Sequence, residues 1–191
     1  MESGLDVNEA ELDRLGELAN IGAGHAADAF AQLVGRTMQM QVPRVLEGVE
    51  AGQIGSEFDG GWSTGVFFEF DGYLDALVGI LFREGASEAV VRSVVGQPAS
   101  EGELPLESIE SALMEVGNIL ASHVASAIAD TVGERLLPSI PMLAMESAGE
   151  TLRDLVADRS AAAARIECEL SDEAGEFGGL LVMVPQEAGV D

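Results

Sequence analysis

Residues 11–30 have the sequence ELDRLGELANIGAGHAADAF, and residues 109–128 have the sequence IESALMEVGNILASHVASAI. Aligned without gaps at an offset of 98 residues, the two stretches are identical at eight of twenty positions. Two Ala-rich helices would match by chance at about two positions. The same offset, continued without gaps, places Pro43 on Pro141. We therefore predict an internal duplication, in which one structural pattern is built twice.

Both stretches have the apolar periodicity of a long amphipathic helix. The first helix is predicted from about Asn8 to Gly35, and the second from Pro105 to about Val132. The apolar stripes consist of Leu12, Leu15, Ala19, Gly22, Ala26, Phe30 and Leu33 in the first helix, and of Leu113, Gly117, Leu120, Val124 and Ile128 in the second. A helix that is apolar on one stripe needs one sheet face to cover it.

The remaining segments are rich in residues that favour strands. Single strands are predicted over 38–45 and 136–145, hairpins over 63–82 and 162–185, and short helices over 84–95 and 150–157. The pair Asp71-Gly72 predicts a tight turn in the first hairpin. The mostly polar segment 99–104 is expected to connect the two repeats.

These elements predict an α+β fold class. We expect an internally duplicated, pseudo-twofold, two-layer domain, in which a central and largely antiparallel sheet carries the two long helices on one side. Residues 1–191 would then form a single domain made of two repeats, about 8–98 and 105–185.

The composition limits the partners that the chain can have. Of the 191 residues 47% are hydrophobic, which is enough for a core, but 34 acidic residues face nine basic ones and the net charge is −25. Such a surface argues against binding to nucleic acid or to an anionic membrane. All nine basic residues are Arg. An acidic surface without Lys favours a salt-rich cytoplasm and hence a halophilic archaeon. Drift in a GC-rich genome is the alternative explanation for the missing Lys.

Neither a signal peptide nor a membrane span is predicted. The N-terminus lacks a basic start followed by an apolar stretch, and the apolar stretch 109–128 is interrupted by Glu110, Glu115, Asn118 and His123. The single cysteine, Cys168, allows no intramolecular disulfide and no thiolate metal cluster, and it is expected in the core of a strand. A cytoplasmic protein without membrane insertion is expected.

Two polar pairs are repeated at the same spacing, Glu17 with Asn20 and Glu115 with Asn118. In each pair the two side chains are three residues apart, so they project side by side from the face opposite the apolar stripe. Asn is a mediocre helix former, and a merely solvated face has little need of one. A coincidental polar face would be the default interpretation of one copy, but two copies favour a functional site.

An isoleucine follows each Asn, at Ile21 and Ile119, also away from the apolar stripe. An apolar side chain beside a fixed carboxylate and amide is typical of a surface that binds another protein. The alternative is that the sheet or a neighbouring loop covers both residues.

The patterns Asp13-x3-Glu17-x2-Asn20-x22-Pro43 and Ser111-x3-Glu115-x2-Asn118-x22-Pro141 resemble the doubled signature of the CheC family. The segments ELANIGAGHAADA and EVGNILASHVASA are similar to the two helices of that family, and FDGYLDALVGILF is similar to its strand pair. The family is grouped with CheX and FliY, the chemotaxis phosphatases that act on phosphorylated CheY. The first position differs between the copies, Asp13 in one and Ser111 in the other.

The resemblance implies a protein phosphatase that hydrolyses the aspartyl phosphate of the CheY receiver domain. An amide can hold a water in line with phosphorus, so Asn20 and Asn118 would position the attacking water. Glu17 and Glu115 would pair with the lysine of the receiver. The chain would need no cofactor or metal of its own, because the receiver supplies Mg²⁺.

Further residues and partners are implied as well. Asp13 and Ser111 would be accessory polar positions, and Pro43 and Pro141 would shape a strand end near the helix. Ile21 and Ile119 would contact the partner. The resemblance also implies binding of the receptor deamidase CheD, and we expect a monomer. The alternative function is a non-catalytic adaptor of the same fold that binds CheD or a receiver domain.

Two other motifs are weaker. Residues 22–27, GAGHAA, match the dinucleotide fingerprint G-x-G-x-x-A, but that motif should follow a strand and open a helix, whereas here it lies inside a helical pattern. The only histidines, His25 and His123, occupy equivalent positions of the two repeats. A shared metal site is conceivable, but two histidines alone make a poor site, and polar residues flanking a helix contact are commoner.

Overall fold

The computed structural model describes residues 9–47, 61–157 and 164–186. In chain order the elements are α1 (Glu9–Val34), β1 (Met38–Met40), β2 (Arg44–Glu47), β3 (Thr64–Gly72), β4 (Ala76–Phe82), α3 (Ala86–Val95), the short 3₁₀ helix η2 (Ala99–Glu101), α4 (Leu106–Val132), β5 (Leu136–Pro138), β6 (Met142–Ala144), α5 (Ala148–Ala157), β7 (Ala164–Asp172) and β8 (Gly178–Pro185). The two long helices lie where their apolar periodicity predicts them.

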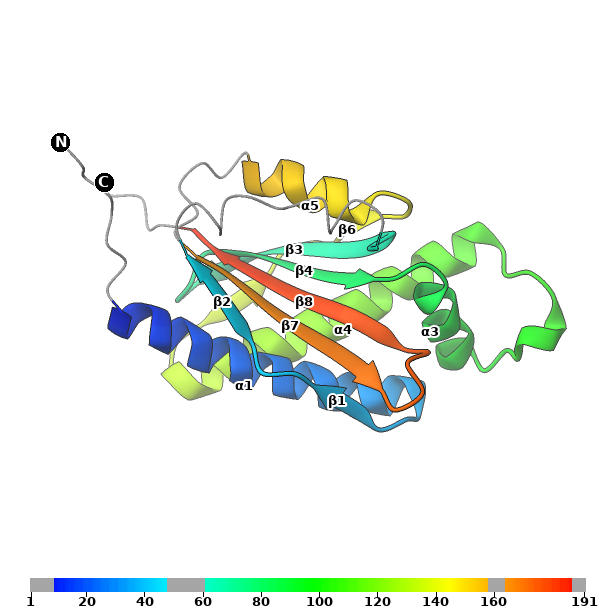
Figure 1. The fold of residues 1–191 in the computed structure, drawn as a ribbon, viewed down its shortest axis with the longest axis horizontal. Coiled ribbons are helices and arrows are strands. Elements are labelled where there is room, and N and C mark those ends of the chain that lie inside the picture. Colours follow the sequence, from blue (N-terminus) through cyan, green and yellow to red (C-terminus); the bar gives the residue numbers. More distant parts are fainter. Residues whose placement is uncertain (1–8, 48–60, 158–163, 187–191) are drawn as a thin grey trace.

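The strands form one antiparallel sheet in the order β1-β7-β8-β4-β3-β5, with β2 also paired to β7 and β6 to β3 (Figure 1). The corresponding strands of the two halves are β1 and β5, β3 and β7, and β4 and β8. Exchanging each strand for its counterpart gives the same order read from the other edge, with β4 and β8 paired at the centre. The short strands β1 and β2 pair with the hairpin of the second half, and β5 and β6 pair with the hairpin of the first. The two halves are therefore interlocked through backbone hydrogen bonds.

The 98-residue offset reappears in the positions of these elements. Helix α1 ends at Val34 and α4 at Val132, each followed by a glycine with positive φ. Strands β1 and β5 begin 98 residues apart, as do β2 and β6, while β3 and β7 begin 100 residues apart. Among the described elements, the order of the two halves differs in the short helices, since α3 follows its hairpin and α5 precedes its own.

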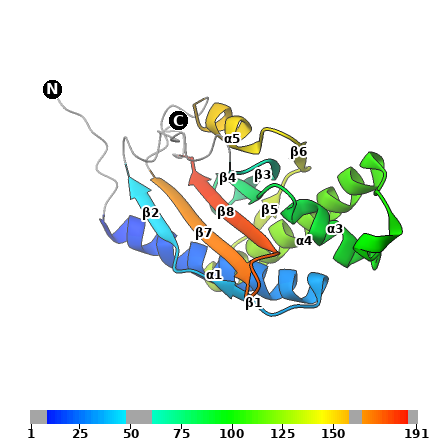
Figure 2. The same ribbon diagram turned by 45° about the vertical axis from the view of Figure 1, so that its right-hand side comes forward.

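One core lies between the sheet and the two long helices. It contains side chains of α1 and α4 such as Phe30 and Leu120, together with Phe68 and Ile166 from the sheet. The predicted fold class is confirmed: the sheet is antiparallel and both long helices cover one face. Beyond that prediction, α5 packs on the opposite face over a second apolar cluster that includes Phe67 and Leu152 (Figure 2).

Two local predictions were wrong. Asp71-Gly72 is not the hairpin turn, because β3 continues through both residues while pairing with Leu137 and Leu136 of β5, and the chain turns at 73–75. The predicted single strands over 38–45 and 136–145 are each divided into two short strands. The gaps, 41–43 and 139–141, each end in a proline, which has no N–H to donate to a neighbouring strand.

Helix α4 is long and apolar enough to cross a membrane, but half of its most apolar window is buried inside the protein. The buried positions include Leu113, Val116, Leu120 and Val124, which belong to the common core. Its apolar character is thus explained by packing against the sheet and α1.

Candidate functional site

The two Glu/Asn pairs lie on the outer surface of the long helices. Glu17 and Asn20 of α1 are exposed, whereas Ala19 and Ala23 beside them are buried against the core. Because side chains three residues apart share one helix face, the carboxylate and the amide stand next to each other in solvent.

The second pair has the same environment. Glu115 and Asn118 of α4 are exposed, and Val116 and Gly117 between them are buried. Each half of the chain thus presents one carboxylate and one amide, at the same spacing and on the same kind of surface.

The two pairs lie on different helices and are well separated from each other. Helices α1 and α4 run in opposite directions (Figure 1) and meet where a Cβ on Gly22 would lie 2.9 Å from Cγ1 of Val124. Asn20 precedes Gly22 by two residues and Asn118 precedes Val124 by six. In antiparallel helices these steps add to about 12 Å along the axes, and packed helix axes are themselves about 8–10 Å apart.

Within residues 9–47, 61–157 and 164–186, no hydrogen bond or ion pair engages the four side chains Glu17, Asn20, Glu115 and Asn118. The nearest basic residue in sequence, Arg14, is held elsewhere: its Nε donates to Tyr73 Oη at 2.9 Å, and its guanidinium lies 5.7 Å from the Tyr73 ring centroid. Both carboxylates and both amides are therefore available to an external partner.

The residues around each pair complete its surface. Asp13 and Ser111, one turn before the glutamates, are exposed, while Ile21 and Ile119 are half-buried. Neither isoleucine belongs to the buried core. Each isoleucine thus leaves part of an apolar side chain in solvent next to an amide.

Edge strand β2 borders the first pair, and β6 contacts α4 at the equivalent place in the second half. A Cβ on Gly16 would lie 3.4 Å from Cγ2 of Val45, which places β2 against the flank of α1 from which Asn20 projects one turn later. Pro43 lies in the gap before β2, and Pro141 in the equivalent gap before β6. Val42 and Ile140, the residues directly before these prolines, are 85% and 87% exposed and were not predicted as site residues. The available signal was their 98-residue offset and their position directly before the two prolines.

The weaker motifs find no structural support. The stretch 22–27 lies wholly within α1 and does not follow a strand. His25 and His123 are both exposed. Among the residues that the structure describes, no three His, Cys, Asp or Glu side chains come together as metal ligands.

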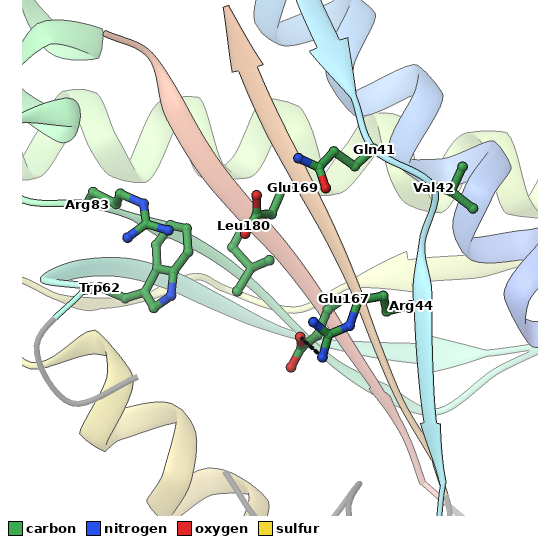
Figure 3. Close-up of a pocket in the computed structure, with 8 residues that line it drawn as sticks. All are labelled: Gln41, Val42, Arg44, Trp62, Arg83, Glu167, Glu169 and Leu180. Atoms are coloured by element: carbon green, nitrogen blue, oxygen red, sulfur yellow. Dashed lines mark ion pairs between the residues drawn. The ribbon is translucent and has the colours of Figure 1, made fainter. Parts of the chain in front are cut away.

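A separate cavity of about 240 Å³ lies on the sheet face opposite α1 and α4 (Figure 3). Its lining consists of Gln41, Val42, Arg44, Trp62, Arg83, Glu167, Glu169 and Leu180. The charges in it are already engaged in part, since Arg83 stacks 4.3 Å from the Trp62 ring centroid and Arg44 pairs with Glu167 at 3.9 Å. The cavity does not include any of the four Glu/Asn side chains.

Known proteins resemble this chain in sequence and in fold. The sequence pattern of the CheC-like family matches residues 11–47 and 109–139, two segments that begin 98 residues apart and contain the two polar pairs. The CheY-P phosphatase CheC of Bacillus subtilis (strain 168) is 32% identical over 157 residues, covering 78% of this chain and 72% of that protein. The putative CheY-P phosphatase CheC1 of Halobacterium salinarum is 28% identical over 141 residues, covering 74% of this chain and 71% of that protein.

Among solved structures, the complex of CheX with CheY, BeF3 and Mg²⁺ from Borrelia burgdorferi has the same fold. Its TM-score is 0.64 at 14% identity, and the match covers 89% of this chain and 98% of that one.

Proposed function

This chain belongs to the CheC-like family, and from that premise we propose that it hydrolyses the aspartyl phosphate of the phosphorylated response regulator CheY. The observation that carries the proposal is the duplicated pair of exposed Glu and Asn side chains, one pair on each long helix, within the segments that match the family. Such a protein would act in the cytoplasm, where its substrate would be found.

In the proposed reaction this protein has to supply few catalytic groups. An acyl phosphate is already reactive, and a receiver domain brings its own Mg²⁺ and lysine to the reaction. What remains is to hold a water in line with phosphorus and to hold the receiver in place. The amide oxygen of Asn20 or Asn118 accepts a hydrogen bond from that water, while the amide nitrogen donates to an oxygen of the substrate.

The glutamates have a different part in this proposal. Glu17 and Glu115 carry exposed carboxylates without a cation partner in the described part of the chain, so each is free to form an ion pair with the receiver lysine. Asp13 and Ser111 add polar contacts one turn away, and Ile21 and Ile119 add apolar ones. Because the two pairs are distant from each other, each half would act on its own receiver.

The decisive experiment measures the decay of the acyl phosphate on the cognate receiver, with and without this protein. We expect the wild-type protein to accelerate decay. Replacing both Asn20 and Asn118 by Ala should reduce the acceleration by about two orders of magnitude, the usual cost of losing a positioned catalytic group. Receiver binding should be largely retained, because the glutamates remain. Gln32→Ala, which removes an exposed amide from the same helix as Asn20, is the matched control.

Each outcome of this series discriminates between models. An equal loss of binding and turnover in the double Asn variant would contradict the assignment of the amides to the chemical step. If either single Asn variant were fully inactive, one composite site would replace two independent ones. Binding of the receiver, or of CheD, without any acceleration by the wild-type protein would favour the adaptor function.

A further inference from the structure

Two large apolar side chains are exposed almost completely, Val42 at 85% and Ile140 at 87%. They are 98 residues apart, so they occupy equivalent places in the two halves, and each precedes a proline in the gap of an edge strand pair. An exposed apolar side chain at a sheet edge favours unwanted association unless it has a partner. Because such an exposed residue occurs in both halves, each half is expected to use it to bind a partner.

The backbone on both sides of these residues is fixed. The N–H of Gln41 donates to the carbonyl of Glu169 at 3.0 Å, and the N–H of Ser139 donates to the carbonyl of Glu69 at 2.7 Å. The following proline restricts the conformation of Val42 and of Ile140. Both side chains are therefore presented in a defined direction, and binding through them requires little further ordering.

In the second half the anchoring is reinforced by a side chain. Ser139 Oγ accepts a hydrogen bond from the N–H of Glu69 at 2.9 Å and donates to the carbonyl of Ile140 at 3.0 Å. In the first half, Cys168 Sγ donates to the carbonyl of Gln41 at 3.1 Å. Each exposed residue thus has a rigid attachment to the neighbouring strand.

In the first half the exposed residue lies near Asn20, and in the second half β6, which follows Ile140, contacts α4 in the way that β2 contacts α1. Gly16 faces Val45, and one helical turn of about 6 Å leads from Gly16 to Asn20. Strand β2 runs opposite to α1 (Figure 1), so the direction from Gly16 to Asn20 is the direction from Val45 back toward Pro43. An extended chain covers about 6 Å in two residues, which places Pro43 beside Asn20, with Val42 next to Pro43. Figure 3 shows Gln41 and Val42 projecting from opposite sides of the chain; Val42 borders the rim of the cavity on the far sheet face and is otherwise exposed beyond the sheet edge.

We propose that Val42 and Ile140 are docking residues for the receiver domain, one for each site. The inference rests on the proposed phosphatase function. Each residue provides an apolar contact that flanks its own Glu/Asn pair, on the side opposite the half-buried isoleucine of the helix. The receiver would therefore be held between the helix face and the edge-strand gap, with its phosphorylated aspartate over the amide.

The test uses variants that leave one working site. In an Asn118→Ala background only the first site turns over, and Val42→Ala should raise KM about tenfold with kcat unchanged, since it removes two methyl groups from the contact. Ile140→Ala should raise KM less in that background. In an Asn20→Ala background the ranking should reverse. Val95→Ala, which truncates a half-exposed residue of α3, is the matched control and should leave KM unchanged in both backgrounds.

Affinity for the receiver charged with beryllofluoride and Mg²⁺ separates this proposal from the phosphatase function. If the wild-type protein fails to accelerate decay but binds this receiver, the phosphatase proposal fails, and weaker binding of the double variant Val42→Ala/Ile140→Ala still supports docking. Unchanged KM and unchanged affinity in the variants would overturn the docking proposal. The docking proposal would also be overturned if the protein self-associated and the double variant abolished that self-association without changing receiver affinity. Both residues would then belong to a contact between copies of this chain.

Discussion

Gly117 lies where α4 passes over β3, and this position has no space for a methyl group. A Cβ there would lie 2.6 Å from Cγ1 of Val66 and 2.9 Å from its Cβ. Val66 is fully buried, is stiff at its first side-chain torsion, and is held by pairing with Ile80 and Leu143 on both sides. The neighbour therefore cannot give way without moving the helix or the strand.

For Gly117→Ala the overpacking costs about 1–3 kcal/mol, and the higher helix propensity of Ala returns about 1 kcal/mol. Because the overlap involves two atoms of a rigid neighbour, we expect the upper part of this range and a net destabilisation of about 1–2 kcal/mol. For a chain of this size the melting temperature should fall by about 2–8 °C.

The matched control is Gly24→Ala on the outer face of α1, where an added Cβ would meet nothing within 4 Å. That variant should gain up to about 1 kcal/mol from helix propensity alone. Thermal unfolding followed by circular dichroism, at one fixed salt concentration, compares the two with wild type. If Gly117→Ala were as stable as Gly24→Ala, the close approach of α4 to β3 would be refuted.

Two further predictions concern the titratable groups that the structure perturbs. Burial acts to raise the pKa of Asp172, but hydrogen bonds from the Phe177 N–H and the Arg36 guanidinium outweigh it and hold that pKa below its ordinary value. Arg36→Gln should therefore lower the free energy of unfolding by about 1 kcal/mol at neutral pH. The difference from wild type that depends on Asp172 should vanish as the pH falls through the folded-state pKa of Asp172. Denaturant titrations of both proteins across pH measure this difference. Burial, with a smaller effect of the Glu169 charge, raises the pKa of the Cys168 thiol to about 11. Alkylation by iodoacetamide at pH 8 should thus be slow in the folded protein and fast after unfolding, and fast labelling of the folded protein would contradict the burial of this thiol.

The two long helices were predictable because the spacing of their apolar residues follows the helical period and so identifies the buried face. The stripes that contain Ala19, Phe30, Leu113 and Leu120 face one core, and the helix ends lie where the pattern stops. The polar pairs were recognisable for a similar reason: a repeated amide on an exposed helix face has no packing role that would explain it.

The parts that failed depend on partners distant in sequence. Asp71-Gly72 has the chemistry of a tight turn, but pairing with β5, more than sixty residues later, keeps both residues in β3. Pro43 and Pro141 were a local sign of the strand splitting at 41–43 and 139–141, but the register of the short strands on either side depends on β7 and β3, which no local pattern identifies. The exposure of Val42 and Ile140 was hidden by their composition, since a β-branched residue inside a strand-like segment is ordinarily assigned to a core.

The interlocking of the two halves constrains how such a protein can evolve. A deletion that removed one repeat would take the short edge strands from the remaining hairpin and would leave its central strand paired on one side only, so the remaining half would not keep the sheet. A point substitution at Asn20 or Asn118, by contrast, touches no strand and leaves the sheet whole. Point substitutions can therefore change either polar pair without disturbing the sheet, but the half of the gene that encodes the pair must be retained.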